Sequence, residues 1–172
     1  MNILSALLIS CVLLLAPGCF QVRWGDNHDY LRQAEEASRQ KDWDLAVASY
    51  RRHIDSRLAI QSRPDWENPW FYLLMIGDIE LGRERPEPAL LSYQEAFDKG
   101  VERGLVSDRF RLVATWYEQR GRLSEALDLL KQHREKDELL FDIMLDRISR
   151  ELTRREDALP AAAGTSNSEK QP

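Results

Sequence analysis

Small residues recur at fixed positions along this chain, and their spacing limits the folds open to it. Three times, two small residues stand twelve positions apart, as Ala34 and Ala46, Gly77 and Ala89, and Ala114 and Ala126. A bulky residue stands four positions before each pair, as Tyr30, Leu73 and Phe110. Residues at i and i+4 share one helix face, and a small residue twelve positions on falls in a second helix. The spacing therefore predicts pairs of closely packed helices, or αα-hairpins.

Turn signals stand between the two members of each pair. Residues 40–44 (QKDWD), 82–88 (GRERPEP) and 121–124 (GRLS) combine helix-stopping and helix-starting residues. In the third of these segments we expect Gly121 to close one helix and Ser124 to open the next.

Residues 116–133 (WYEQRGRLSEALDLLKQH) resemble the tetratricopeptide repeat, and residues 41–54 and 73–97 resemble divergent copies of it. The resemblance implies an all-α fold, an antiparallel αα-hairpin array of about three repeats at residues 27–60, 69–100 and 107–135. The family's period is about 34 residues, whereas Ala46 and Ala89 are 43 residues apart and Ala89 and Ala126 are 37 apart. The larger insertion falls in residues 56–69, where Asn68 and Pro69 are typical of a helix start. It leaves open how the first repeat stacks on the second.

A longer helix is predicted for residues 137–157. Its apolar residues are expected on one broad face: Leu140, Ile143, Met144, Leu145, Ile148 and Leu152. Repeat arrays need a terminal element with one polar face, so we interpret this helix as the cap of the repeat domain, which spans residues 27–157. Residues 158–172 lack aromatic and β-branched apolar side chains apart from one threonine, and are expected to form a disordered tail.

The N-terminal segment is typical of an exported protein. Residues 3–16 form a 14-residue apolar run, too short for a membrane-spanning helix, which needs about 20 residues, but suited to a signal peptide at residues 1–18. Gly18 before Cys19 resembles the bacterial lipobox, so lipid modification of Cys19 is expected. Simple cleavage and retention as an uncleaved anchor are the alternatives. Residues 19–26 then form a short tether that holds the domain near the membrane.

Composition and motifs disfavour several classes of function. With 24 basic and 29 acidic residues and a net charge of −5, the chain lacks the basic excess of nucleic-acid-binding proteins. It contains no GxGxxG, GxxxxGK[ST], HExxH or CxxC motif. We therefore expect a protein that is not an enzyme, with no catalytic residue, metal, cofactor or small-molecule substrate. His53 and His133, at equivalent positions, are expected to pack inside the fold.

The family resemblance also implies a peptide-binding groove lined by the first helix of each repeat. It places nine residues there: Leu31, Glu35, Phe71, Leu74, Asp78, Leu81, Arg111, Thr115 and Glu118. Because these side chains are mostly apolar or acidic, we expect a ligand that presents apolar side chains beside Lys or Arg. The alternative is that Leu31, Leu74 and Leu81 only complete the core.

Together these features predict a lipid-anchored protein of the bacterial cell envelope that faces the periplasm. Phe20 rather than Asp follows Cys19, which favours the outer over the inner membrane. The chain resembles envelope lipoproteins that carry tetratricopeptide repeats, which implies a scaffold or assembly factor bound to a protein or peptide partner. The alternative is a periplasmic chaperone that holds exported clients.

Overall fold

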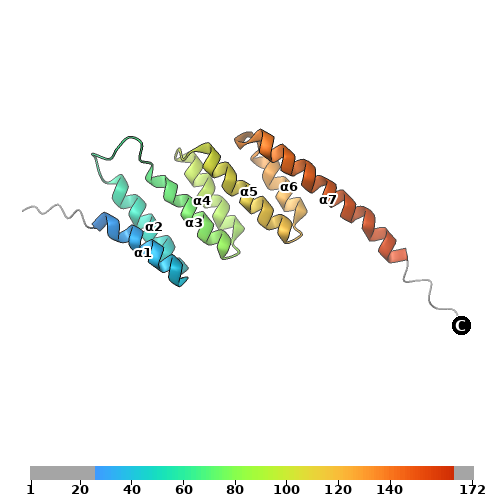
Figure 1. Ribbon diagram of the computed structural model, residues 1–172, viewed down its shortest axis with the longest axis horizontal. Helices are drawn as coiled ribbons and strands as arrows, with labels where there is room; N and C mark the ends of the chain where they lie inside the picture. The colour runs from blue at the N-terminus through green and yellow to red at the C-terminus, as the bar shows by residue number, and fades with distance from the viewer. Residues whose placement is uncertain (1–25, 165–172) are drawn as a thin grey trace, which may run out of the picture.

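The computed structural model describes residues 26–164, with side-chain surroundings for residues 29–158, and this part of the chain contains helices and no strand. The elements are α1 (Asp26–Gln40), α2 (Trp43–Leu58), η1 (Pro69–Phe71), α3 (Tyr72–Gly82), α4 (Pro86–Asp98), α5 (Arg103–Gln119), α6 (Leu123–Gln132), η2 (Arg134–Lys136) and α7 (Glu138–Gly164). Figure 1 shows the helices in a single row that follows chain order. The prediction of an all-α fold is confirmed. The expected signal peptide, Cys19 and most of the tether lie outside the described residues.

The turns inside the three helix pairs share one backbone geometry. Lys41, Glu84 and Gly121 each adopt a left-handed conformation, with φ of 61°, 61° and 74°. In each turn, the amide of the next residue donates to the carbonyl five positions earlier at 2.9 Å, a pattern that ends a helix and reverses the chain. Gly121 therefore closes α5 as predicted. Ser124 does not open α6, because that helix begins one residue earlier and Arg122 occupies its N-cap position.

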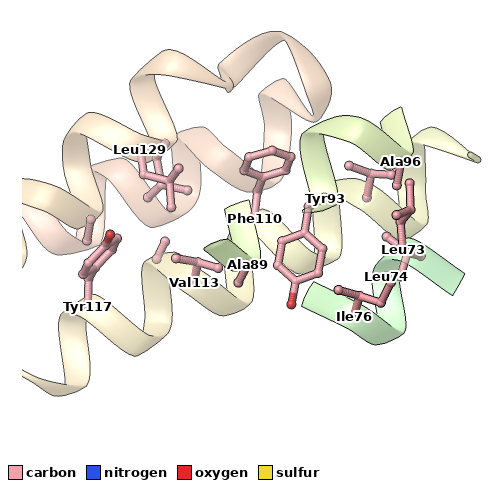
Figure 2. Close-up of a cluster of buried hydrophobic side chains, with 14 of the residues drawn as sticks. Leu73, Leu74, Ile76, Ala89, Tyr93, Ala96, Phe110, Val113, Tyr117 and Leu129 are labelled. Atoms are coloured by element: carbon pink, nitrogen blue, oxygen red, sulfur yellow. The ribbon is translucent and has the colours of Figure 1, made fainter. Parts of the chain in front are cut away.

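The small residues of the sequence pattern all lie at buried positions between helices. Gly77 on α3 lies very close to the Tyr93 ring on α4, since a Cβ atom at position 77 would lie 2.2 Å from Tyr93 Cε1. Tyr93 is fully buried and its ring meets Phe110 of α5 edge to face, at 6.4 Å between centroids. Figure 2 shows this ring between Ile76 and Phe110. One core thus runs through consecutive helix pairs.

The insertion between the first two pairs does not separate them, because α2 packs directly against α3. Helix α2 ends at Leu58, and an irregular segment leads to η1, whose N-cap is Asn68. The Asn68 side chain accepts a hydrogen bond from the Trp70 amide at 3.1 Å, and Pro69 occupies the first turn. The predicted helix start at Asn68 and Pro69 is confirmed for this short 3₁₀ turn.

Helix α7 differs in part from the expected cap. Its fully buried residues are Phe141 and Ile148, whereas Ile143 is 56% exposed and Leu140 lies at the surface as well. The prediction of one broad apolar face is therefore wrong for Leu140 and Ile143, since residues seven positions apart, two helical turns, form the buried stripe. Helix α7 continues to Gly164, seven residues beyond the expected end of the cap, and the rest of the expected tail lies outside the described residues.

Candidate functional site

The nine residues predicted to line a groove all lie on or at the start of α1, α3 and α5. They are Leu31 and Glu35 on α1, Phe71 in η1, Leu74, Asp78 and Leu81 on α3, and Arg111, Thr115 and Glu118 on α5. They do not form one continuous surface. Leu31 and Phe71 line one hollow, and Thr115 and Glu118 line another.

Leu74 is not a surface residue. It has no exposed area and belongs to the core, as does its neighbour Leu73. Helix α3 packs against α2, α4 and α5, so most of its circumference is covered and two adjacent leucines are both buried. Leu81 is partly buried and packs against the same core. The prediction that Leu74 lines a groove is wrong, and the alternative that it completes the core holds for this residue.

Asp78 serves the fold. Its carboxylate accepts two hydrogen bonds from the Arg109 guanidinium on α5, at 3.2 and 3.0 Å, and one from the Tyr93 hydroxyl at 2.8 Å. Burial, together with the Asp78 charge, raises the pKa of Tyr93, which therefore stays protonated as the donor. The acidic charge expected to attract a ligand at Asp78 is thus largely neutralised inside the structure.

The α5 residues are also engaged with nearby groups. Glu118 accepts a hydrogen bond from Arg147 of α7 at 2.8 Å. Arg111 pairs with Asp108 on the same helix, and the Thr115 hydroxyl donates to the Arg111 carbonyl at 2.9 Å. Near Thr115 and Glu118, the hollow between α5 and α7 is lined mainly by arginines that carry carboxylate partners. Only the Glu118–Arg147 pair among these joins α5 to α7, and the other pairs lie within one helix.

The hollow that Leu31 and Phe71 line, which we call the aromatic pocket, has the mixture of side chains expected of a binding site. Its volume is about 790 Å³, and it is open to solvent. Its apolar lining comes from α1, η1, α3, α5, the segment before η1 and the connection between α4 and α5: Leu31, Trp66, Pro69, Phe71, Tyr72, Val101 and Leu105. Pockets of this size with a mostly apolar lining and a few polar groups are typical ligand sites.

The insertion between α2 and α3 builds one wall of the aromatic pocket. Arg57 at the end of α2 donates to both oxygens of Glu67, at 2.6 and 2.5 Å, and this pair fixes the segment. The hydrogen bonds from Arg57 hold the pKa of the Glu67 carboxyl below its usual value. Trp66, the residue before Glu67, is 84% exposed. The pair therefore fixes the backbone beside a large aromatic side chain that the rest of the described chain leaves uncovered.

Tyr72 sits at the centre of an aromatic group that forms another part of the pocket wall. Its ring meets those of His53 at 4.6 Å, Phe71 at 5.8 Å and Tyr50 at 5.9 Å between centroids. Burial, followed by the charges of Glu67 and Glu35, raises the pKa of the Tyr72 hydroxyl. This wall is therefore a fixed aromatic surface with acidic groups close by.

Both histidines pack against aromatic rings, as predicted. His53 is buried against Tyr72, and the His133 ring lies 4.1 Å from that of Phe110 between centroids. Burial lowers the pKa of His133, with a smaller effect from the nearby Lys136 charge. His133 is therefore neutral at neutral pH, and its partly buried ring packs against Phe110.

Sequence reasoning placed Leu31 and Phe71 in the candidate site but missed Trp66, Tyr72 and Leu105. Tyr72 and Leu105 carry no signal beyond an apolar position near a helix start. Trp66 did carry one, because it stands within a polar segment between Pro64 and Pro69, where an aromatic side chain has no helix face to bury.

The described residues and the comparisons add three findings. Among the side chains of residues 29–158, no three His, Cys, Asp or Glu come together as a metal site. None of the helices within residues 26–164 has the length and apolar character needed to cross a bilayer. No protein-family model matches the chain, and no curated protein matches it in sequence.

Proposed function

We propose that this chain is a tetratricopeptide-like repeat protein, anchored in the bacterial cell envelope through a lipid on Cys19, that acts as a scaffold or assembly factor for a protein partner. The observation that carries this proposal is the aromatic pocket, an open and largely apolar hollow on an all-helical fold. An open apolar recess with a few polar groups at its edge suits the docking of an apolar side chain from a protein segment.

The backbone supports the repeat part of the proposal. Lys41, Glu84 and Gly121 repeat the same left-handed turn with the same hydrogen bond. The small residues at matching positions are buried in all three helix pairs. Three supersecondary units with one turn geometry are what stacked repeats require.

The pocket lies close to the expected anchor. Eight chain steps from Cys19 to Asn27 reach at most about 29 Å, and Leu31 lies about 6 Å farther along α1. A lipid at Cys19 would therefore keep the pocket within about 35 Å of the membrane surface. This position favours a partner that is itself at the membrane.

Affinity purification of the full-length chain from detergent-solubilised membranes tests the proposal. The scaffold function predicts one dominant co-purifying protein near equal stoichiometry, and the intact mass of the bait reports whether residues 1–18 are removed and acyl chains added to Cys19. A diffuse set of exported clients would favour the chaperone alternative. Recovery of the bait alone at native abundance would contradict both.

A further inference from the structure

We infer that the aromatic pocket takes one large apolar side chain from an extended segment of the partner, and that Glu35 and Glu102 select a lysine or arginine beside that side chain. This inference rests on the proposed function and specifies the chemistry of the partner. It follows from the aromatic side chains that are exposed at the pocket and from the carboxylates near it that form no salt bridge.

The pocket exposes aromatic surface on rigid supports. Trp66 is 84% exposed and Phe71 is 38% exposed. Phe71 closes a 3₁₀ turn fixed by Asn68 and by the buried Pro69, and the Arg57–Glu67 pair fixes the backbone next to Trp66. Because the backbone that carries both rings is already positioned, a ligand side chain would gain apolar burial at a reduced cost of ordering the walls.

The charges near the pocket leave an acidic surplus. Arg57 and Glu67 neutralise each other, and Arg63, which donates to the Arg57 carbonyl and also acts on Glu67, offsets one further acidic charge. Glu102 lines the pocket, and its side chain accepts a hydrogen bond from the Gly104 amide at 3.3 Å. Glu35 lies one helical turn beyond Leu31, and its charge contributes to the raised pKa of Tyr72. Neither Glu35 nor Glu102 forms a salt bridge with another residue in the described part of the chain.

The occupant is therefore an apolar side chain with a neighbouring cation. A segment with an acidic residue beside the apolar one would meet two unpaired carboxylates, and like charges at a binding rim reject a ligand. A wholly apolar segment would fill the pocket and leave both carboxylates unpaired. A Leu, Phe or Trp side chain would fill the pocket, and a Lys or Arg beside it would pair with the carboxylates at the rim.

Fluorescence anisotropy with three labelled peptides tests the inference on the full-length protein in detergent micelles. The peptides are Gly-Ser-Lys-Phe-Lys-Ser-Gly, the same peptide with both lysines replaced by glutamate, and the same peptide with phenylalanine replaced by alanine. We expect the first peptide to bind about fivefold more tightly than the glutamate peptide and at least about tenfold more tightly than the alanine peptide. Titrations into protein-free micelles correct for partition into detergent.

Protein variants assign the effect to the pocket. Trp66→Ala is expected to weaken binding of the first peptide about tenfold, and circular dichroism checks that the fold is kept. Leu91→Ala, which removes a leucine that is 73% exposed on α4, is the matched control and should leave binding unchanged. The double variant Glu35→Lys with Glu102→Lys should reverse the preference, so that the glutamate peptide binds better than the lysine peptide.

Other occupants would overturn the inference. Residues 20–25 of this chain (FQVRWG) also combine apolar and basic residues, so a photo-cross-linking amino acid at position 66 would reveal them or a second copy in the pocket. Equal binding of the lysine and glutamate peptides, or of wild type and Trp66→Ala, would also refute it. If the membrane purification still yields a stoichiometric partner that Trp66→Ala retains, the scaffold function stands and only the pocket assignment fails.

Discussion

Replacing Gly77 with alanine tests a close contact between α3 and α4. The added Cβ would lie 2.2 Å from Cε1 and 2.6 Å from Cδ1 of Tyr93, well inside van der Waals contact. The Tyr93 ring has no exposed surface, and its hydroxyl donates to Asp78, so the ring has little room to move. We therefore expect Gly77→Ala to destabilise the fold although alanine favours helix.

The magnitude follows from two opposing effects. Overpacking a rigid core costs up to about 3 kcal/mol, and replacing glycine by alanine inside a helix returns about 1 kcal/mol. The net loss is about 2 kcal/mol in the free energy of unfolding. For a domain of this size, that lowers the melting temperature by roughly 7 °C.

Thermal unfolding of the full-length chain in mild detergent, followed by circular dichroism at 222 nm, measures the shift. Gly82→Ala is the matched control, because it lies in the same helix and nothing stands within 4 Å of its added Cβ. That variant should be as stable as wild type or slightly more stable. In a Tyr93→Leu background, Gly77→Ala should cost less than about 1 kcal/mol, because the clashing ring atoms are gone. A Gly77→Ala protein at least as stable as wild type would refute the close-packing argument.

Three further predictions follow from the turns, the core and the ion pairs. Lys41→Gly should raise the free energy of unfolding by about 1 kcal/mol and Gly121→Ala should lower it by about as much, because both positions are left-handed. Urea titration measures both changes. Changes of the opposite sign would contradict the turn assignment. Burial lowers the pKa of His133, so the unfolded state binds more protons than the folded state. Stability should therefore decline as pH falls below the unfolded pKa of 6.5. Melting curves from pH 8 to pH 5 should show a smaller decline for His133→Gln than for wild type, and an equal decline would exclude this effect. Asp78→Asn should cost about 1 kcal/mol and have little further effect in an Arg109→Ala background, whereas full additivity in that double-mutant cycle would show the pair to be uncoupled.

Local spacing predicted the features that depend on local physics. The twelve-residue interval between small residues reflects two neighbouring helices joined by a tight turn, so it located the helix pairs and the glycine at position 121. It did not predict that Leu74 is buried, because this burial depends on how many helices surround α3. It also did not predict the ion pair between Asp78 and Arg109, because these residues lie 31 positions apart and such pairing leaves no periodic signal in the sequence.

The candidate site was harder to predict for the same reason. The groove residues were assigned by family register, which assumes equal repeats, whereas the insertion before α3 supplies Trp66 and reshapes the surface beside Leu31 and Phe71. An irregular segment has no period from which to infer which way its side chains point. The acidic charge expected at Asp78 is paired with Arg109 instead of facing a ligand.

The most direct test of the central claim is quantitative recovery of the partner with and without the pocket. Full-length wild type, the double variant Trp66→Ala with Phe71→Ala, and the surface control Leu91→Ala would be purified from detergent-solubilised membranes at equal bait amounts. Our account predicts that the pocket variant loses most of the dominant co-purifying protein, by about tenfold, while the control retains it. Equal recovery by all three proteins would contradict the claim that this pocket is the binding site.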